Sequence, residues 1–306
     1  MRIGNVTRRA AILGGLSAVL VPSVAWPRGD ERDAEGGIGG TGIVGVVTDT
    51  GPLLVSGTAL VVNGRTAFTD GFGAFSGGNL RQGHSLTVEA QPSGGRLAAR
   101  RVHVTYPLVG KISAISSDGR RIRVNGVDVL LERRLRGLRR GDRVAVSGIW
   151  RGTTVVASRV DPSRSPLDLV SGDVTRQRAS AVVGGVTLRG ASTARLLRRT
   201  FAEVVGTYDA ETNRFQARST QADRIKGAAG PLARLVVEGY LQTDNRAPGY
   251  RISGLGHSFA RNLDLSRLAQ NRALFAGEYT GRFAVETAVA LPEAQQARYR
   301  LLRSLR

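Results

Sequence analysis

The sequence predicts an all-β protein made of about four tandem copies of one small barrel-like unit, with short connecting helices and a helix at the C-terminus. Three observations lead to this fold class. A chain of 306 residues is long enough for several domains. A glycine-centred pattern recurs along it at nearly constant spacing. The segments between the glycines alternate apolar and polar residues, as half-buried strands do.

The first repeated landmark is a glycine with apolar residues two positions before and two positions after it. It is centred on Gly45, Gly110, Gly172 and Gly239, which stand 65, 62 and 67 residues apart. A second landmark, an apolar strand end that closes on a glycine, follows each of them after 12 to 16 residues. The glycines of this second landmark are Gly57, Gly126, Gly185 and Gly254.

A third landmark is an alternating strand that contains a glycine. It is centred on Gly148, Gly206 and Gly277, and Ala90 takes the place of the glycine in the first copy. Because three landmarks recur in one order, we interpret the chain as divergent copies of a single unit.

The second copy shows the order of elements within a unit. Strands are expected over 108–115, 121–125, 127–132, 143–150 and 155–160, with a short helix over 135–140. Five strands with a helix between the third and the fourth is the order of an oligonucleotide/oligosaccharide-binding (OB) barrel. We therefore expect tandem OB-like five-stranded barrels, each with a first strand that bends at its glycine.

The landmarks and the composition divide the chain into seven segments. These are a signal peptide over 1–25, a flexible Gly-rich arm over 26–42, OB-like repeats over 43–105, 106–162, 167–224 and 231–291, and a basic helix over 292–306.

The first 25 residues read as a secretory signal. Arg8 and Arg9 precede an uncharged stretch, and Ser23-Val24-Ala25 has the small-x-small pattern of a cleavage site. The segment matches the twin-arginine export motif only in part, so twin-arginine and general secretory export both stay open. The uncharged stretch is too short to span a bilayer. We expect a periplasmic or secreted protein with no transmembrane span in the mature chain.

Several stretches resemble one bacterial family. They are the Gly-rich segment 37–42 running into 43–48, and the strands 86–90, 144–148 and 156–160. Together they are similar to the exported domain-of-unknown-function family 5666. The resemblance covers most of 37–161 and, more weakly, the two later copies. It implies small repeated β-barrel units outside the cytoplasm, and it carries over no catalytic or binding residues.

The composition argues against most enzyme chemistry. The chain has no cysteine, which excludes disulfides and thiolate chemistry, and its three histidines stand far apart. The aspartates lie beside glycines or in expected turns, where they bond to the backbone. We expect no catalytic residues, no cofactor and no metal site, and so no enzyme.

The net charge of +20 comes almost entirely from arginine, because only Lys111 and Lys226 are lysines. Such an excess attracts anions, although it also keeps the chain soluble. The usual ligand face of an OB barrel is the outside of strands two and three with the flanking loops. On that face the candidate anion-binding residues are Arg120, Arg121, Arg123 and Arg151 in the second copy, and Arg246, Arg251 and Arg282 in the fourth. The dense arginine run 133–140 is interpreted instead as the solvated face of the short helix.

These observations predict a non-enzymatic envelope protein that binds or scaffolds through cationic surfaces. Its partner would be an anionic envelope polymer or a lipid surface. Two alternatives stay open, a purely structural module for a protein partner and an OB-fold nucleic-acid binder. Neither predicted face carries an outward aromatic side chain, and each base stacked on one is worth about 1–3 kcal/mol. The sequence therefore argues against specific nucleic-acid binding.

Overall fold

The computed structural model describes residues 39–177, 180–190, 193–196, 201–227, 230–242, 249–252, 255–260 and 263–305. The predicted signal peptide, most of the predicted arm and Arg246 lie outside these residues. Strands dominate the described chain, which confirms the all-β fold class.

Barrels 1 and 2 contain the first twelve strands. Barrel 1 consists of β1 (Gly40–Thr50), β2 (Leu53–Val55), β3 (Thr58–Val61), β6 (Ser85–Ser93) and β7 (Arg96–Val104), with β4 (Ala67–Asp70), β5 (Gly73–Ala74) and η2 (Gly77–Asn79) inserted. Barrel 2 consists of β8 (Leu108–Ile115), β9 (Arg121–Val124), β10 (Val127–Leu131), β11 (Arg143–Arg151) and β12 (Thr154–Pro162).

Barrels 3 and 4 follow, and α2 (Gln295–Ser304) ends the described chain. Barrel 3 consists of β13 (Asp168–Gln177), β14 (Ser180–Val183), β15 (Val186–Arg189), α1 (Thr193–Leu196), β16 (Phe201–Asp209) and β17 (Arg214–Ala222). Barrel 4 consists of β18 (Leu232–Gln242), β19 (Gly249–Ile252), β20 (Gly256–Ala260), η3 (Ser266–Leu268), β21 (Arg272–Tyr279) and β22 (Phe283–Ala290).

Each copy closes into a ring of five strands. In barrel 2, β8 pairs with β9, β9 with β10, β10 with β12, β12 with β11, and β11 again with β8. Only β10 and β12 run parallel. The other three barrels repeat this order with one parallel pair each. The first-second-third-fifth-fourth order is that of an OB barrel.

The third sequence landmark marks a β-bulge in the fourth strand of every ring. The strand register shifts at Ser147/Gly148, Val205/Gly206, Ala276/Gly277 and, in barrel 1, Glu89/Ala90. A Cβ on Gly206 would stand 2.0 Å from the carbonyl oxygen of Gln216. Glycine is therefore required there because the bulge brings the fifth strand too close for a side chain.

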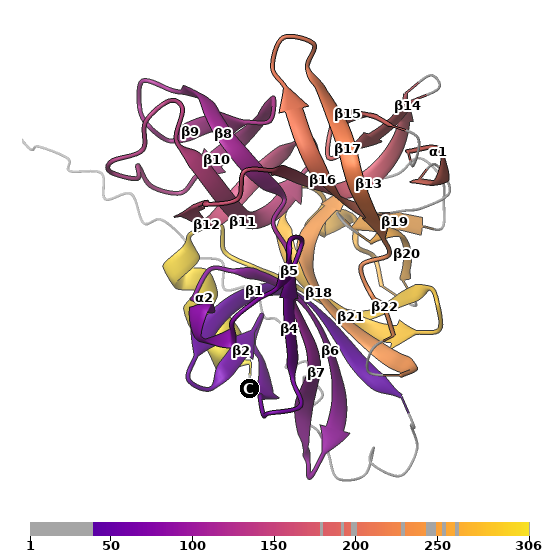
Figure 1. The fold of residues 1–306 in the computed structure, drawn as a ribbon. Coiled ribbons are helices and arrows are strands. Elements are labelled where there is room, and N and C mark those ends of the chain that lie inside the picture. The colour runs from indigo at the N-terminus through magenta and orange to yellow at the C-terminus, as the bar shows by residue number, and fades with distance from the viewer. Residues whose placement is uncertain are drawn as a thin grey trace, which may run out of the picture.

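The four barrels associate in two pairs. The first strands of barrels 1 and 4, β1 and β18, pair in parallel. The first strands of barrels 2 and 3, β8 and β13, pair antiparallel. In Figure 1, barrels 2 and 3 lie side by side in the upper half of the view, and barrels 1 and 4 lie below them.

The predicted arm is too long by three residues. Residues 40–42 belong to β1, where all three pair with β18 and residues 41 and 42 also pair with β6. A side chain on Gly40 would meet the carbonyl oxygen of Ala90 at 2.5 Å. The glycines are therefore explained by three strands meeting closely rather than by flexibility.

The glycine of the first strand lies beneath the turn that joins the second and third strands. In barrel 2, a Cβ on Gly110 would stand 2.1 Å from the side-chain oxygen of Asn125. The amide Nδ2 of Asn125 donates to the carbonyl of Val109 at 2.9 Å and to that of Leu169, in barrel 3, at 3.1 Å. The first repeated glycine thus makes room for a turn side chain that joins two barrels.

Replacing Asn125 with alanine is expected to destabilise the protein by about 1–3 kcal/mol. The change removes both hydrogen bonds of a side chain that is 2% exposed and leaves buried carbonyl groups unpaired. Asn213→Ala is the control, because Asn213 also has a positive φ but is exposed. Urea unfolding followed by circular dichroism measures both. Equal losses in the two variants would show that Asn125 acts only through its backbone conformation.

The predicted C-terminal helix is confirmed as α2, which packs at a junction of three barrels. Tyr299 clusters with Val46 of barrel 1, Ile149 of barrel 2 and Tyr240 of barrel 4. The backbone amide of Gln295, in the first turn of α2, donates to the carboxylate of Glu132 in barrel 2. Within the described residues, no helix has the length and apolarity needed to cross a bilayer.

A buried ionic centre fixes α2 to barrels 1 and 4. Glu238 and Arg272 are each 1% exposed or less, and Oε1 of Glu238 lies 2.7 Å from Nη2 of Arg272. Arg298 of α2 places its Nε 3.7 Å from the same oxygen. Ser56 of barrel 1 donates its hydroxyl to the other oxygen of Glu238, Oε2, at 2.5 Å. We refer to these four residues as the Glu238 centre.

Candidate anion-binding surface

Barrel 2 carries the largest share of the excess positive charge among the four barrels. Residues 106–162 contain twelve basic and five acidic residues, a net charge of +7 out of +20 for the whole chain. Basic residues are therefore denser in this repeat than in the chain as a whole.

The alternation predicted for the second strand of barrel 2 is confirmed. Ile122 and Val124 on β9 are 1% and 0% exposed, whereas Arg121 and Arg123 are exposed. Arg120, in the loop before β9, is also exposed. Three of the four candidate residues in this copy thus lie together on one surface.

The predicted helix over 135–140 is wrong. This segment forms bends and turns, and Gly137 has a φ of +83°, which a right-handed helix does not allow. Arg139 donates its backbone N–H to Asp142 Oδ2 at 2.7 Å, and this bond stabilises the turn instead. The arginine run therefore lies on an open loop between β10 and β11.

This loop lies beside the loop between β8 and β9. The backbone amide of Leu131 donates to the carbonyl of Arg120 at 2.8 Å. A Cβ on Gly119 would stand 2.8 Å from Cγ of Arg134. The two loops share one end of barrel 2, and all eight arginines on and beside them are exposed. These residues are Arg120, Arg121, Arg123, Arg133, Arg134, Arg136, Arg139 and Arg140, and we call them the basic end of barrel 2.

Arg151 does not join the other candidates of its copy. Val146 on β11 pairs with Leu108, the first residue of β8, so Arg151 lies beyond the N-terminal end of β8. Arg120 lies in the loop that follows the C-terminal end of β8, at the opposite end of the barrel. The guanidinium of Arg151 lies over the ring of Tyr240 in barrel 4, 5.6 Å from the ring centroid. Arg151 thus contributes to a contact between barrels.

The candidates in barrel 4 are also separated. Arg251 on β19 pairs with Gln242 at the C-terminal end of β18. Arg282 lies in the turn after β21, whose Glu278 pairs with Arg234 near the N-terminal end of β18. The two arginines therefore occupy opposite ends of the barrel.

The basic end of barrel 2 has little acidic compensation. Within the described residues, only Arg123 of the eight forms an ion pair, with its Nε 2.8 Å from Oδ1 of Asp128. Asp118 lies in the loop before Arg120. Hydrogen bonds from the Ser116 hydroxyl and the Arg120 amide, together with the charges of Arg120 and Arg121, lower its pKa below the usual value. Asp118 therefore stays ionised, and its main contacts are within its own turn.

Two histidine–carboxylate pairs with buried histidines were not predicted from the sequence. Nε2 of His84 in barrel 1 lies 3.1 Å from Asp161 in barrel 2, and Nε2 of His103 in barrel 1 lies 3.1 Å from Glu203 in barrel 3. Each partner is 77 or 100 residues away from its histidine, so no local motif marks the pairs. Within the described residues, no group of three or more metal-ligating side chains is present. The two pairs therefore connect barrel 1 to barrel 2 and to barrel 3.

The fold and the surface define an all-β protein of four OB-like barrels with a cationic end on the second barrel. Comparison with known families adds one match. Residues 41–103 and 109–161, which correspond to barrels 1 and 2, match the sequence profile of the domain of unknown function DUF5666. The match confirms the resemblance noted from the sequence over this part of the chain, as two adjacent copies of the domain. No curated protein and no solved structure matches the chain.

Proposed function

We propose that the protein is a non-enzymatic, exported binding module that attaches to an anionic component of the cell envelope through the basic end of barrel 2. The observation that carries the proposal is the set of eight exposed arginines at one end of one barrel, of which only Arg123 is ion-paired within the described chain. Unpaired cations grouped in this way raise the local concentration of anions and their rate of association.

The other three barrels carry less excess positive charge. Some of their charged side chains form contacts between barrels, as in the Glu238 centre and the His103–Glu203 pair. The envelope location rests on the basic and apolar pattern of the first 25 residues.

A single-stranded nucleic acid is a weaker candidate for the partner. Neither β9, with the sequence RIRV, nor β10, with the sequence VDVLL, carries an aromatic side chain. Binding without stacked bases would depend on phosphate contacts alone.

Reversing charges at the basic end is expected to weaken retention on heparin resin strongly. The variant is Arg121→Glu with Arg139→Glu and Arg140→Glu, all at exposed positions without an ion pair in the described chain. Its elution salt concentration should fall roughly to half, because the attraction is electrostatic and screened by salt.

A matched control is Arg65→Glu with Arg96→Glu and Arg100→Glu in barrel 1, which changes the net charge equally at exposed positions. This control should elute close to the unmodified protein. Equal shifts in the two variants would show that total charge, and not the basic end of barrel 2, determines binding, and would overturn the proposal.

A further inference from the structure

Three of the four barrels are closed at one end by a leucine. It lies in or next to a short helical element between the third and fourth strands of the ring. These leucines are Leu80 beside η2, Leu196 in α1 and Leu265 beside η3, with exposures of 7%, 2% and 2%. Each belongs to the hydrophobic core of its barrel.

Barrel 2 lacks this closure. Leu138 stands five residues before β11, as Leu80 stands before β6 and Leu196 before β16, but Leu138 is only half-buried. Ile115, at the end of β8, is 37% exposed, one of the few large apolar side chains of the described chain that reach solvent. No helix forms at Leu138, where Gly137 has a positive φ, and Leu135 and Leu138 pack against the core only partly buried.

A hollow of about 600 Å³ occupies this end of barrel 2. Its lining combines apolar and cationic side chains. The apolar ones, which we call its base, are Ile115, Ile122, Leu135 and Leu138, and the exposed arginines, which we call its rim, are Arg134 and Arg136. A volume of this size is typical of sites for small organic ligands.

The two rim arginines are available for an anion. Within the described residues, neither Arg134 nor Arg136 is ion-paired, and both are exposed. The side-chain stem of Arg134 lies beside Gly119, which also lines the hollow. An anionic group bound there would lie directly beside the apolar base.

We propose that this hollow binds an anionic lipid, with an acyl chain against Ile115, Leu135 and Leu138 and the headgroup phosphate between Arg134 and Arg136. The proposal rests on the proposed function and names the ligand of the same surface. A purely polar anionic polymer would use the arginines but would leave the apolar base in contact with water. An acyl chain removes this apolar surface from water, which favours binding.

The test compares dioctanoyl phosphatidylglycerol, kept below its micelle concentration, with glycerophosphoglycerol, which has the same phosphodiester headgroup but no acyl chains. Isothermal titration calorimetry on the full chain should show at least about tenfold tighter binding of the lipid, because burying even two CH₂ groups is worth that factor. Equal affinities would overturn the proposal and leave the arginines as a site for polar anions.

Ser117→Trp should fill the hollow without changing the charge. Ser117 is exposed and lines the hollow, so we expect the affinity for the lipid to fall about tenfold or more. The matched control is Ser219→Trp on β17, also exposed and in another barrel, which should bind the lipid like the unmodified protein. Ile115→Ser gives the same test without added bulk.

The two proposals fail in different ways. Unchanged lipid affinity in both Ser117→Trp and Ile115→Ser would overturn the lipid site, whatever the result on heparin. If Ser117→Trp loses lipid binding while its heparin elution stays unchanged, the apolar part of the hollow is needed for the lipid but not for a polyanion, as proposed. If the basic-end variant keeps its heparin elution, the proposed function is wrong even where the lipid binds.

Discussion

Replacing Glu238 with alanine is expected to cost about 3–5 kcal/mol of stability, among the largest effects of any single change in this protein. The substitution leaves Arg272 and Arg298 as uncompensated charges, and these side chains are 0% and 3% exposed. Removing one partner from a buried ion pair has this cost because the remaining charge stays out of water. It also removes the acceptor for Ser56 and so loosens barrel 1 from barrel 4.

The matched control is Glu286→Ala in the same barrel. Glu286 pairs with Arg234 at 3.0 Å, but both side chains are about a third exposed or more, so the loss should stay below about 1 kcal/mol. Urea unfolding followed by circular dichroism measures both variants. If Glu238→Ala loses no more stability than Glu286→Ala, the centre does not hold the barrels together.

The same centre predicts the direction of the pH dependence. Burial by itself would raise the pKa of Glu238, but the charges of Arg272 and Arg298 and the Ser56 hydrogen bond outweigh it and hold the pKa below its usual value of 4.5. A carboxylate with a lowered pKa in the folded state contributes its full stability above about pH 4.5 and loses it as the pH falls further. The difference in stability between the unmodified protein and Glu238→Gln should therefore shrink as the pH falls from 7 to 3.

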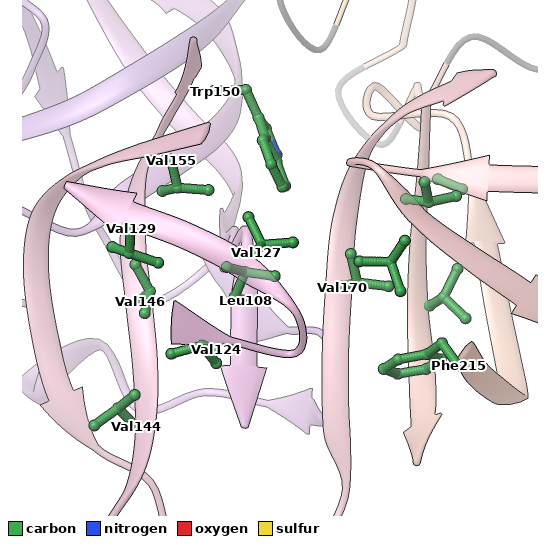
Figure 2. Packing of buried hydrophobic residues seen from close by; sticks show 14 of the residues in the cluster. Leu108, Val124, Val127, Val129, Val144, Val146, Trp150, Val155, Val170 and Phe215 are labelled. Carbon is green, nitrogen blue, oxygen red and sulfur yellow. The ribbon is translucent and has the colours of Figure 1, made fainter. Parts of the chain in front are cut away.

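Replacing Trp150 with alanine is expected to cost about 3–5 kcal/mol and to separate barrels 2 and 3. Trp150 is 7% exposed, and its indole Nε1 donates to the carbonyl of Ser171 in barrel 3 at 2.7 Å. A Cβ on Gly184 would stand 2.3 Å from its Cζ2, so barrel 3 has a glycine where the ring needs space. Figure 2 shows the ring between the strands of the two barrels. Large-to-small changes of buried aromatic residues have costs of this size.

Hydrogen exchange measured by mass spectrometry locates the effect of this change. In Trp150→Ala, the amides of β13 should exchange faster, because that strand pairs with β8 next to the lost ring. Phe72→Ala is the control, since Phe72 is 39% exposed. Unchanged exchange in β13 would mean that Trp150 serves barrel 2 alone.

Within one barrel, the sequence was a good guide to the structure. The repeated glycines mark positions where the backbone has no room for a side chain. These close approaches come from the geometry of the five-stranded ring, so they recur in each copy. The strand order of barrel 2 and the outward direction of Arg121 and Arg123 followed from alternation. The helix over 135–140 was predicted from the spacing of the leucines. It does not form, because Gly137 has a positive φ that a right-handed helix does not allow.

Contacts between barrels could not be predicted in the same way. Alternation shows that a side chain leaves the core of its own barrel, but not whether it then meets water or another barrel. Arg151 was therefore assigned to the surface, although it lies over Tyr240. The Glu238 centre was missed for the same reason, because its members come from three separate parts of the chain.

The pairing of the barrels determines the order in which the molecule can be completed. Barrels 2 and 3 are neighbours in the chain, so their contact forms over a short loop. In the sequence, barrels 1 and 4 stand on either side of this pair. The hydrogen bond from the backbone amide of Val46 to the carboxylate of Glu238 joins residues 192 positions apart. Contacts between such distant residues form late, because closing a long loop costs entropy before any contact is gained. Until barrel 4 has emerged and folded, one side of the first half of β1 remains an open strand edge, and the last barrel to be made is the one that covers it.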